Sequence, residues 1–200
     1  MKLRFPKGDT HFNSDAWDNY QLTQYRQAVK MTRVKGVAVD CGAHAGIMTR
    51  RMSEDFQTVH AFEPVHTELL KHNIQDLENV TVYSSALSDA PGTGFIVLNE
   101  SNSGDNRLSD QGLPVEITTI DSMNFSSVDF IKMDIQGAEL PALQGATETI
   151  LECHPTIMIE VEKNDPWREE LEDTLKDWDY TMRYNRNADW IWVWDGWRYC

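Results

Sequence analysis

The sequence lacks a long apolar run. No window of its 200 residues approaches the roughly 20 consecutive apolar residues of a membrane-spanning helix. The basic start of the chain, residues 1–7, is followed by no apolar stretch, so it does not resemble a secretion signal. We therefore expect a cytoplasmic protein that has no membrane partner.

Basic residues are also scarce. Lys and Arg number 18 against 32 Asp and Glu, which leaves a net charge of −14 at pH 7. Binding to nucleic acids depends on Lys and Arg that replace the counterions of the phosphates, and only residues 30–35 and 50–51 cluster such side chains. We therefore expect no nucleic-acid partner. The acidity suits a small neutral acceptor or a cationic ligand, although it can also serve solubility alone.

Cysteine is the third scarcity. Cys41, Cys153 and Cys200 are odd in number and widely spaced, so they imply no disulfide framework. Cys41 and His44 have the spacing of half a zinc site, but no second pair of Cys and His follows them. We expect no structural zinc and assign no metal ligands.

A regular alternation of apolar strands and helical segments is what the sequence does contain. Its 40% hydrophobic share excludes a disordered chain. We expect strands at residues 36–40, 58–63, 80–83, 128–134, 156–161, 180–184 and 190–194, and helices at 46–52, 64–74, 138–151 and 167–178. This alternation predicts an α/β fold with a mostly parallel sheet, helices on both of its faces and a C-terminal antiparallel hairpin.

Two domains of unequal size follow from the pattern. Residues 1–35 are expected to form an N-terminal helical extension, with a helix that Ser14 can cap and that places Leu22, Tyr25 and Ala28 on one face. Residues 36–200 would form the main domain. Within it, residues 95–98 predict a strand outside the repeating unit.

Two segments have more than one interpretation. Residues 99–112 are polar and 14 residues long, which fits either a plain connection or a mobile lid that closes over an acceptor. Trp190, Trp192 and Trp194 alternate and share one face of a strand. Such a stripe can stack single-stranded bases, but few basic residues accompany it, so we expect a buried strand.

Three acids stand at the ends of predicted strands. Asp40, Glu63 and Asp134 each follow an apolar run. Ligands of open parallel sheets bind outside the carboxyl ends of the strands, at the point where the strand order reverses. We therefore expect these three side chains to lie on one rim of the sheet.

The strongest chemical signal is the segment DCGAHAG at residues 40–46, with Glu63 following 23 residues after Asp40. Gly42 and Gly46 allow a tight turn and close approach of a ligand, and an acid in the position of Glu63 can bind a ribose diol. A dinucleotide would need the spacing GxGxxG, and its pyrophosphate would meet the carboxylate of Asp40. S-adenosylmethionine carries cations and no phosphate, so it is favoured, although a turn without a ligand also explains the glycines.

Four segments together resemble the FkbM-type family of S-adenosylmethionine-dependent methyltransferases. They are residues 39–46, FEP at 62–64, SALSD at 85–89 and DFIKMDIQGAE at 129–139, the most specific of the four. The resemblance spans residues 37–161 and weakly continues through 189–193. It implies a Rossmann-like class I methyltransferase fold with a mostly parallel seven-stranded sheet. It also implies O-methylation of a hydroxyl on a sugar, polyketide or similar small molecule.

The resemblance also implies a set of residues for the cofactor S-adenosylmethionine. The methionine end would meet the 40–46 segment, the ribose would meet Glu63, and the adenine would meet the 85–86 segment. His44 can alternatively be an ordinary loop residue. The cofactor-binding residues so assigned are Asp40, Gly42, Ala43, His44, Gly46, Glu63, Pro64, Ser85 and Ala86.

Asp134 and Lys132 are the candidate catalytic residues. Asp134 is placed to act as a base or as an anchor for the acceptor, and Lys132 lies on the same side of the strand. Lys132 can instead form a structural ion pair. Glu160 and Glu162 could join Asp134 around a divalent cation, but a solvated strand end is the simpler interpretation.

Other functions remain open on these residues. A nucleotide-cofactor oxidoreductase of the NAD type would have to bind its cofactor without GxGxxG. The family usually has Glu where this chain has Gln136, so a catalytically silent binding module is a further alternative. No segment of the form N/D-P-P-Y/F is present, which argues against methylation of adenine or cytosine.

Overall fold

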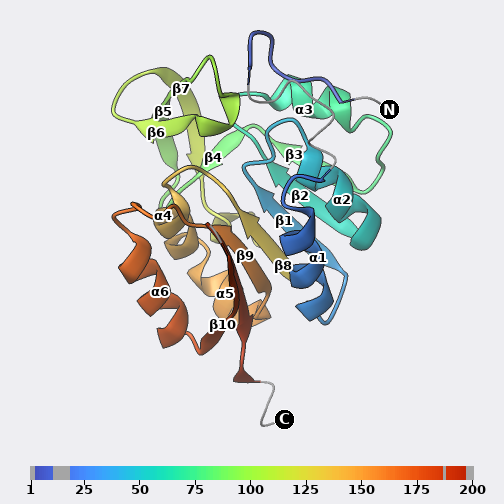
Figure 1. Ribbon diagram of the computed structural model, residues 1–200, viewed down its shortest axis with the longest axis vertical. Helices are drawn as coiled ribbons and strands as arrows, with labels where there is room; N and C mark the ends of the chain where they lie inside the picture. Colours follow the sequence, from blue (N-terminus) through green and yellow to red (C-terminus); the bar gives the residue numbers. More distant parts are fainter. Residues whose placement is uncertain (1–2, 11–18, 187, 197–200) are drawn as a thin grey trace.

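A seven-stranded sheet forms the centre of the computed structural model, which describes residues 3–10, 19–186 and 188–196. The strand order is β10-β11-β9-β8-β1-β2-β3. Five neighbouring strands are parallel, and β11 is antiparallel to β9 and to β10. The bounds are β1 Val37–Cys41, β2 Thr58–Phe62, β3 Val80–Tyr83, β8 Phe130–Met133, β9 Thr156–Glu160, β10 Tyr180–Arg186 and β11 Asp189–Trp194. The predicted mostly parallel sheet with a C-terminal hairpin is therefore confirmed (Figure 1).

Helices cover both faces of this sheet. On one face α1 (Leu22–Met31) and α2 (Ile47–Asp55) pack on the core that contains Ala38 and Phe130. On the other face α4 (Glu139–Gln144), α5 (Thr147–Cys153) and α6 (Arg168–Asp177) pack on the core that contains Val39 and Ile131. Neighbouring residues of one strand thus pack into the cores on opposite faces of the sheet, as the two-residue period of a strand requires.

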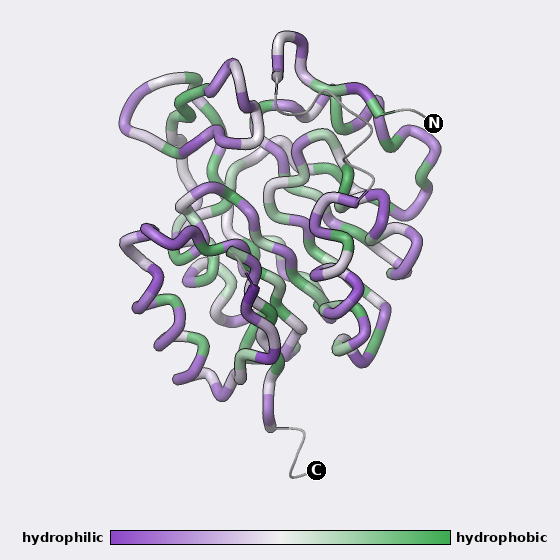
Figure 2. The backbone as a smooth tube through the Cα atoms, viewed as in Figure 1, coloured by the Kyte–Doolittle hydropathy of each residue, from purple (hydrophilic) through white to green (hydrophobic). Residues whose placement is uncertain are grey.

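The apolar residues concentrate on the central strands, and hydrophilic ones are more frequent on the outer helices and loops (Figure 2). Trp190 and Trp192 are fully buried in β11, so the expectation of a buried strand is confirmed for these two residues. Among the described residues, no helix has the length and the apolar character that crossing a membrane requires.

A second sheet of four strands lies beside the main one, in the order β4-β7-β5-β6 (Figure 1). Its strands are β4 Ser85–Leu87, β5 Gly92–Val97, β6 Arg107–Ser109 and β7 Leu113–Thr118. The strand expected at residues 95–98, outside the repeating unit, corresponds to β5. Two of the other three, β4 and β6, were missed because they have only three residues each. The six residues of β7 do alternate, with Leu113, Val115 and Ile117 on one side, but Pro114 within the run argued against a strand.

The helix expected at residues 64–74 begins three residues late. Pro64 precedes α3 (Thr67–Asn73) and is not part of it. The backbone N–H groups of Val65 and His66 donate to Oε1 of Glu63, each at 2.8 Å. This side chain holds the segment in a turn before the helix starts.

The helix expected at residues 138–151 is in fact two helices, α4 and α5. The helix is interrupted at Gly145, where a Cβ atom would lie 2.1 Å from the carbonyl oxygen of Ser88. The carboxylate of Asp121, from the 3-10 helix Asp121–Met123, accepts the N–H groups of Glu148 and Thr149. A new helix N-terminus therefore has its own cap directly after the glycine.

The segment at residues 99–112 is partly ordered rather than a plain loop. It contains the 3-10 helix Ser103–Asp105 and the strand β6. The Ser14 cap expected at the other end of the chain lies outside the described residues, and the N-cap residue of α1 is Gln21.

Candidate active site

Three acids stand at the carboxyl ends of three neighbouring strands, as their positions predicted. Asp40 is the penultimate residue of β1, Glu63 directly follows β2, and Asp134 directly follows β8. Because the strand order is β8-β1-β2, the three residues lie on one rim of the sheet. Strand order reverses about β1, which is the place where such sheets bind ligands.

The loop after β1 depends on its glycines. Gly42 has a φ of +82°, and a Cβ atom there would lie 2.1 Å from the carbonyl oxygen of Asp134. Gly46 has a φ of +86°, and a Cβ atom there would lie 2.9 Å from Cδ1 of Leu70. Only glycine allows this loop to pass so close to the ends of β8 and α3.

Glu63 holds the surrounding backbone. Its Oε2 accepts the N–H of His44 at 2.9 Å, and its Oε1 accepts the two N–H groups that precede α3. A carboxylate offers about four lone-pair sites. Three of them are used here, so one site on Oε2 remains for a hydroxyl of a ligand.

A cavity of about 80 Å³ opens between this loop and the second sheet. Its apolar walls come from β2, β4, β5 and β6, through Phe62, Leu87, Ile96 and Leu108. Six of the nine residues assigned to the cofactor line it: Gly42, His44, Glu63, Pro64, Ser85 and Ala86. We call it the cofactor cavity.

A larger cavity of about 450 Å³ adjoins the first. Ala43, Tyr20 and Glu160 line it, and it shares part of its wall with the cofactor cavity. The shared residues are Gly42, His44, Gly104, Asp134 and Gln136. We call the larger space the acceptor cavity, because its wall meets the cofactor cavity at Asp134.

Asp40 and Gly46 line neither cavity. Asp40 is fully buried, and its Oδ2 accepts a hydrogen bond of 2.6 Å from the hydroxyl of Thr49. Its Oδ1 lies 4.0 Å from Nζ of Lys132 and accepts no hydrogen bond from the described residues. Burial raises the pKa of this carboxyl, although Lys132 and Thr49 oppose the rise. In this structure Asp40 therefore pairs with Lys132 beneath the cavities rather than lining them. Its assignment to the cofactor stays a prediction.

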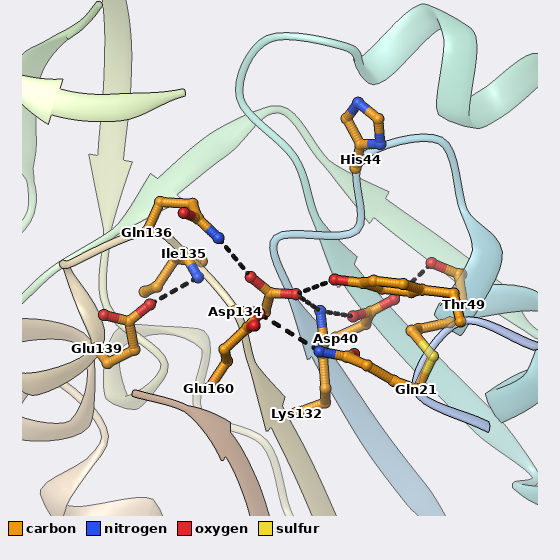
Figure 3. A network of polar contacts seen from close by, with 12 residues as sticks. Gln21, Asp40, His44, Thr49, Lys132, Asp134, Ile135, Gln136, Glu139 and Glu160 are labelled. Atoms are coloured by element: carbon orange, nitrogen blue, oxygen red, sulfur yellow. Dashed lines mark hydrogen bonds and ion pairs between the residues drawn. The ribbon is translucent and has the colours of Figure 1, made fainter. Parts of the chain in front are cut away.

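Lys132 joins the two carboxylates of β1 and β8. Its ammonium is buried and lies 3.2 Å from Oδ2 of Asp134 (Figure 3). Burial opposes the charge, but Asp134 and Asp40 outweigh it and raise the pKa of Lys132 above its usual range. The structure thus shows the ion pair that the sequence left open, and an ammonium held in this way cannot accept a proton at neutral pH.

Asp134 has partners on several sides. Its Oδ1 accepts a hydrogen bond of 2.9 Å from Nε2 of Gln136, and its Oδ2 accepts one of 3.2 Å from Nζ of Lys132 (Figure 3). The hydroxyl of Tyr20 donates a second hydrogen bond to Oδ2, also at 3.2 Å. Burial alone would raise the pKa of Asp134, but Lys132, Glu160 and Gln136 lower it below the usual range. Asp134 is therefore ionised at neutral pH while it faces both cavities.

Glu160, at the end of β9, is the protonated neighbour of Asp134. Burial and the charge of Asp134 raise its pKa well above the usual range, and its Oε2 accepts Nε2 of Gln21 at 3.3 Å. Among the described residues, no group of three or more His, Cys, Asp or Glu side chains is arranged to hold a metal ion. Glu162 lines the acceptor cavity without joining such a group.

Glu139 supports the loop after β8. Its carboxylate accepts the N–H of Ile135 at 2.9 Å (Figure 3). It also accepts the N–H of Gly137 at 2.8 Å. Burial raises the pKa of Glu139 to about 7. The residue thus holds the turn that carries Gln136.

Two contributors to the site were missed in the sequence. Ser103 lines the cofactor cavity, and its hydroxyl lies 2.7 Å from Nε2 of His44 and donates to the carboxylate of Asp9. Tyr20 lines the acceptor cavity. Both come from segments whose spacing carries no motif, so only the polar character of residues 99–112 pointed towards one of them.

Comparison with known proteins places these features in a family. Residues 40–187 match the model of the methyltransferase FkbM domain. Among solved structures, the methyltransferase FkbM of Methylobacillus flagellatus KT is similar, with a TM-score of 0.59 and 20% identity. That match covers 90% of this chain and 56% of the other, so this chain spans little more than half of that protein's length. No curated protein sequence matches.

Two further solved structures agree in fold. The precorrin-6y C5,15-methyltransferase of Geobacter metallireducens GS-15 has a TM-score of 0.58 at 12% identity, covering 96% of this chain and 98% of its own. A protein of Streptococcus mutans, described as a methyltransferase and in complex with SAH, has a TM-score of 0.55 at 12% identity, covering 86% and 94%. The Rossmann-like class I methyltransferase fold is therefore confirmed, and the family match favours it over an NAD-type oxidoreductase. The protein belongs to the FkbM methyltransferase domain family.

Proposed function

We propose that the protein binds S-adenosylmethionine in the cofactor cavity and methylates a hydroxyl of a small molecule held in the acceptor cavity. The observation that supports this most is the shared wall of the two cavities. Asp134 faces both of them, at the place where a methyl donor and an acceptor would have to meet.

The residues present fit S-adenosylmethionine. One lone-pair site of Glu63 is left for a ribose hydroxyl, and the apolar walls of the cofactor cavity suit an adenine. The carboxylate of Asp134 lies where the cationic part of the ligand would approach the shared wall. The family and the solved neighbour in complex with SAH support the same cofactor.

A second observation supports a small, uncharged or cationic acceptor over a nucleic acid. The acceptor cavity is lined by four acidic residues and by two basic ones, Lys132 and Arg107. Lys132 is paired with Asp134, and Arg107 is paired with Asp105 at 2.7 Å. Among the described residues of this wall, no unpaired Lys or Arg is therefore available to neutralise a phosphate backbone.

The chemistry follows from the state of these groups. S-adenosylmethionine, when bound, supplies a methyl group on a sulfonium that an oxygen nucleophile can displace. Asp134 is ionised, so it can accept a hydrogen bond from the acceptor hydroxyl, orient its oxygen and take its proton as the new carbon–oxygen bond forms. Lys132 keeps Asp134 ionised between turnovers.

Calorimetric titration with S-adenosylmethionine, S-adenosylhomocysteine and NAD tests the cofactor. We expect binding of the first two and none of the third. Screening hydroxylated metabolites for transfer of a labelled methyl group then identifies the acceptor. Binding of NAD alone would contradict the proposal, and binding of S-adenosylmethionine without transfer to any acceptor would favour the silent binding module.

A further inference from the structure

Residues 20–24, which lead into the first turn of α1, cross the ends of three neighbouring strands. Tyr20 donates to Asp134 after β8 at 3.2 Å, Gln21 donates to Glu160 of β9 at 3.3 Å, and Gln24 donates to Asp189 of β11 at 2.8 Å. Each contact joins an uncharged donor of this segment to a carboxyl group of the sheet. The contacts follow the strand order β8-β9-β11, so the segment forms a row of donors along the rim.

The backbone of the segment is held in an unusual turn. Gln21 has a φ of 46°, a left-handed conformation that costs energy for a residue with a Cβ atom. The carbonyl oxygen of Tyr20 accepts a hydrogen bond from Arg51 of α2. Contacts on both sides thus fix the point from which the side chain of Tyr20 reaches the rim.

Tyr20 is the donor in its hydrogen bond with Asp134. Burial, followed by the charge of Asp134, raises the pKa of its hydroxyl above its usual range. The phenol therefore stays protonated at neutral pH. Its single proton goes to Oδ2 of Asp134, on the oxygen that also accepts Lys132.

We propose that Tyr20 is a positioning residue for Asp134, so that residues 20–21, directly ahead of α1, are part of the acceptor site. The FkbM match begins at residue 40, and neither the match nor a motif assigns a role to this segment. Tyr20 lines the acceptor cavity and holds Asp134 by one oxygen, while Gln136 holds it by the other. The plane of the carboxylate is thereby fixed towards the shared wall.

This role rests on the proposed function, since positioning matters only if Asp134 meets an acceptor. The contact itself can be tested without an acceptor. The charged and titratable groups that face Asp134 or share its field must be included in any titration: Lys132, Asp40, His44, Glu139, Glu160 and Asp189.

The test compares Tyr20→Phe with Tyr25→Phe. Tyr25 lies on α1 and donates to Asp55 at 2.8 Å, away from both cavities, so its variant removes a matched hydroxyl–carboxylate bond. Carbon-13 NMR of the Asp carboxyls follows Asp134 in each protein. We expect Tyr20→Phe to raise the pKa of Asp134 by about one unit, as the loss of one hydrogen bond to a charged group predicts, and Tyr25→Phe to leave it unchanged.

Two further readouts separate positioning from folding and from the proposed function. S-adenosylhomocysteine affinity should be equal in both variants and the wild type, while methyl transfer should fall about tenfold in Tyr20→Phe alone. In the wild type, the Cζ resonance of Tyr20 should shift with pH, and the midpoint of that shift should equal the pKa of Asp134. The assignment would be overturned if Asp134 had the same pKa in both variants, or if the Tyr20 resonance did not change as Asp134 titrates. A wild type that fails to bind S-adenosylhomocysteine would overturn the proposed function and leave this contact standing.

Discussion

The two sides of the site are built in different ways. On the cofactor side, the main fixed points are backbone groups: glycines with positive φ, and N–H groups that donate to Glu63. On the acceptor side, the fixed points are side chains of Tyr20, Lys132 and Gln136 that meet at Asp134. The first kind of site requires particular residues at short spacing, whereas the second gathers residues from distant parts of the chain. The difference predicts that changes on the two sides have separable effects.

Asp134→Asn should give the largest effect, and this effect should be confined to turnover. The amide keeps the shape but has neither the charge nor the basicity of the carboxylate, so methyl transfer should drop by about 10²–10⁴-fold. S-adenosylhomocysteine affinity, measured by calorimetry, should stay close to that of the wild type. Asp177→Asn, on the exposed surface of α6, is the matched control. Transfer within about threefold of the wild type would make Asp134 a structural residue.

Glu63→Ala should show the opposite pattern. It removes the lone-pair site for a ribose hydroxyl and also releases three backbone N–H groups. One charge-assisted hydrogen bond corresponds to about 1.5–3 kcal/mol, so we expect S-adenosylhomocysteine to bind about tenfold to a hundredfold more weakly. Glu68→Ala removes an exposed carboxylate of α3 that pairs with Lys71 and should leave affinity unchanged. Equal affinities in the two variants would refute the ribose assignment.

Gln136→Glu tests the position at which the family resemblance implies Glu. The amide donates to Oδ1 of Asp134 at 2.9 Å, and a carboxylate there would replace a donor by a like charge. We expect the pKa of Asp134 to rise, and the acid limb of the methyl-transfer profile to move upward by about one pH unit. Gln144→Glu, at the end of α4, controls for the added charge. An acid limb at the same pH in the variant and the wild type would show that Gln136 does not affect the pKa of Asp134.

The same difference explains what could be predicted from the sequence. The segment at residues 40–46 and Glu63 are fixed by backbone geometry, so their spacing indicated the rim and most of the cofactor cavity. The apolar strands were found because burial leaves a periodic pattern. Tyr20 and Ser103 could not be found, because a hydrogen bond between residues 114 positions apart leaves no pattern in the chain. The strands β4 and β6 were missed because they are too short to show a period, and β7 because Pro114 lies within its alternating run. The break at Gly145 depends on contact with Ser88.

Glu160→Gln should have its main effect on stability, where it reveals a cost carried by the acceptor side. Burial and Asp134 raise the pKa of Glu160, so the folded protein keeps a proton that the unfolded chain releases above about pH 4.3. Wild-type stability is therefore lost as the pH rises from that value towards the folded pKa, whereas a Gln side chain does not titrate. Urea unfolding at pH 4.5, 6 and 8 should show little difference at the lowest pH, and an advantage for the variant that grows by up to about 1.4 kcal/mol per pH unit above it. Glu169→Gln, an exposed position of α6, should keep the wild-type pH dependence. Parallel curves for Glu160→Gln and the wild type would mean that Glu160 is ionised in the folded protein, and that the acceptor side bears no such cost.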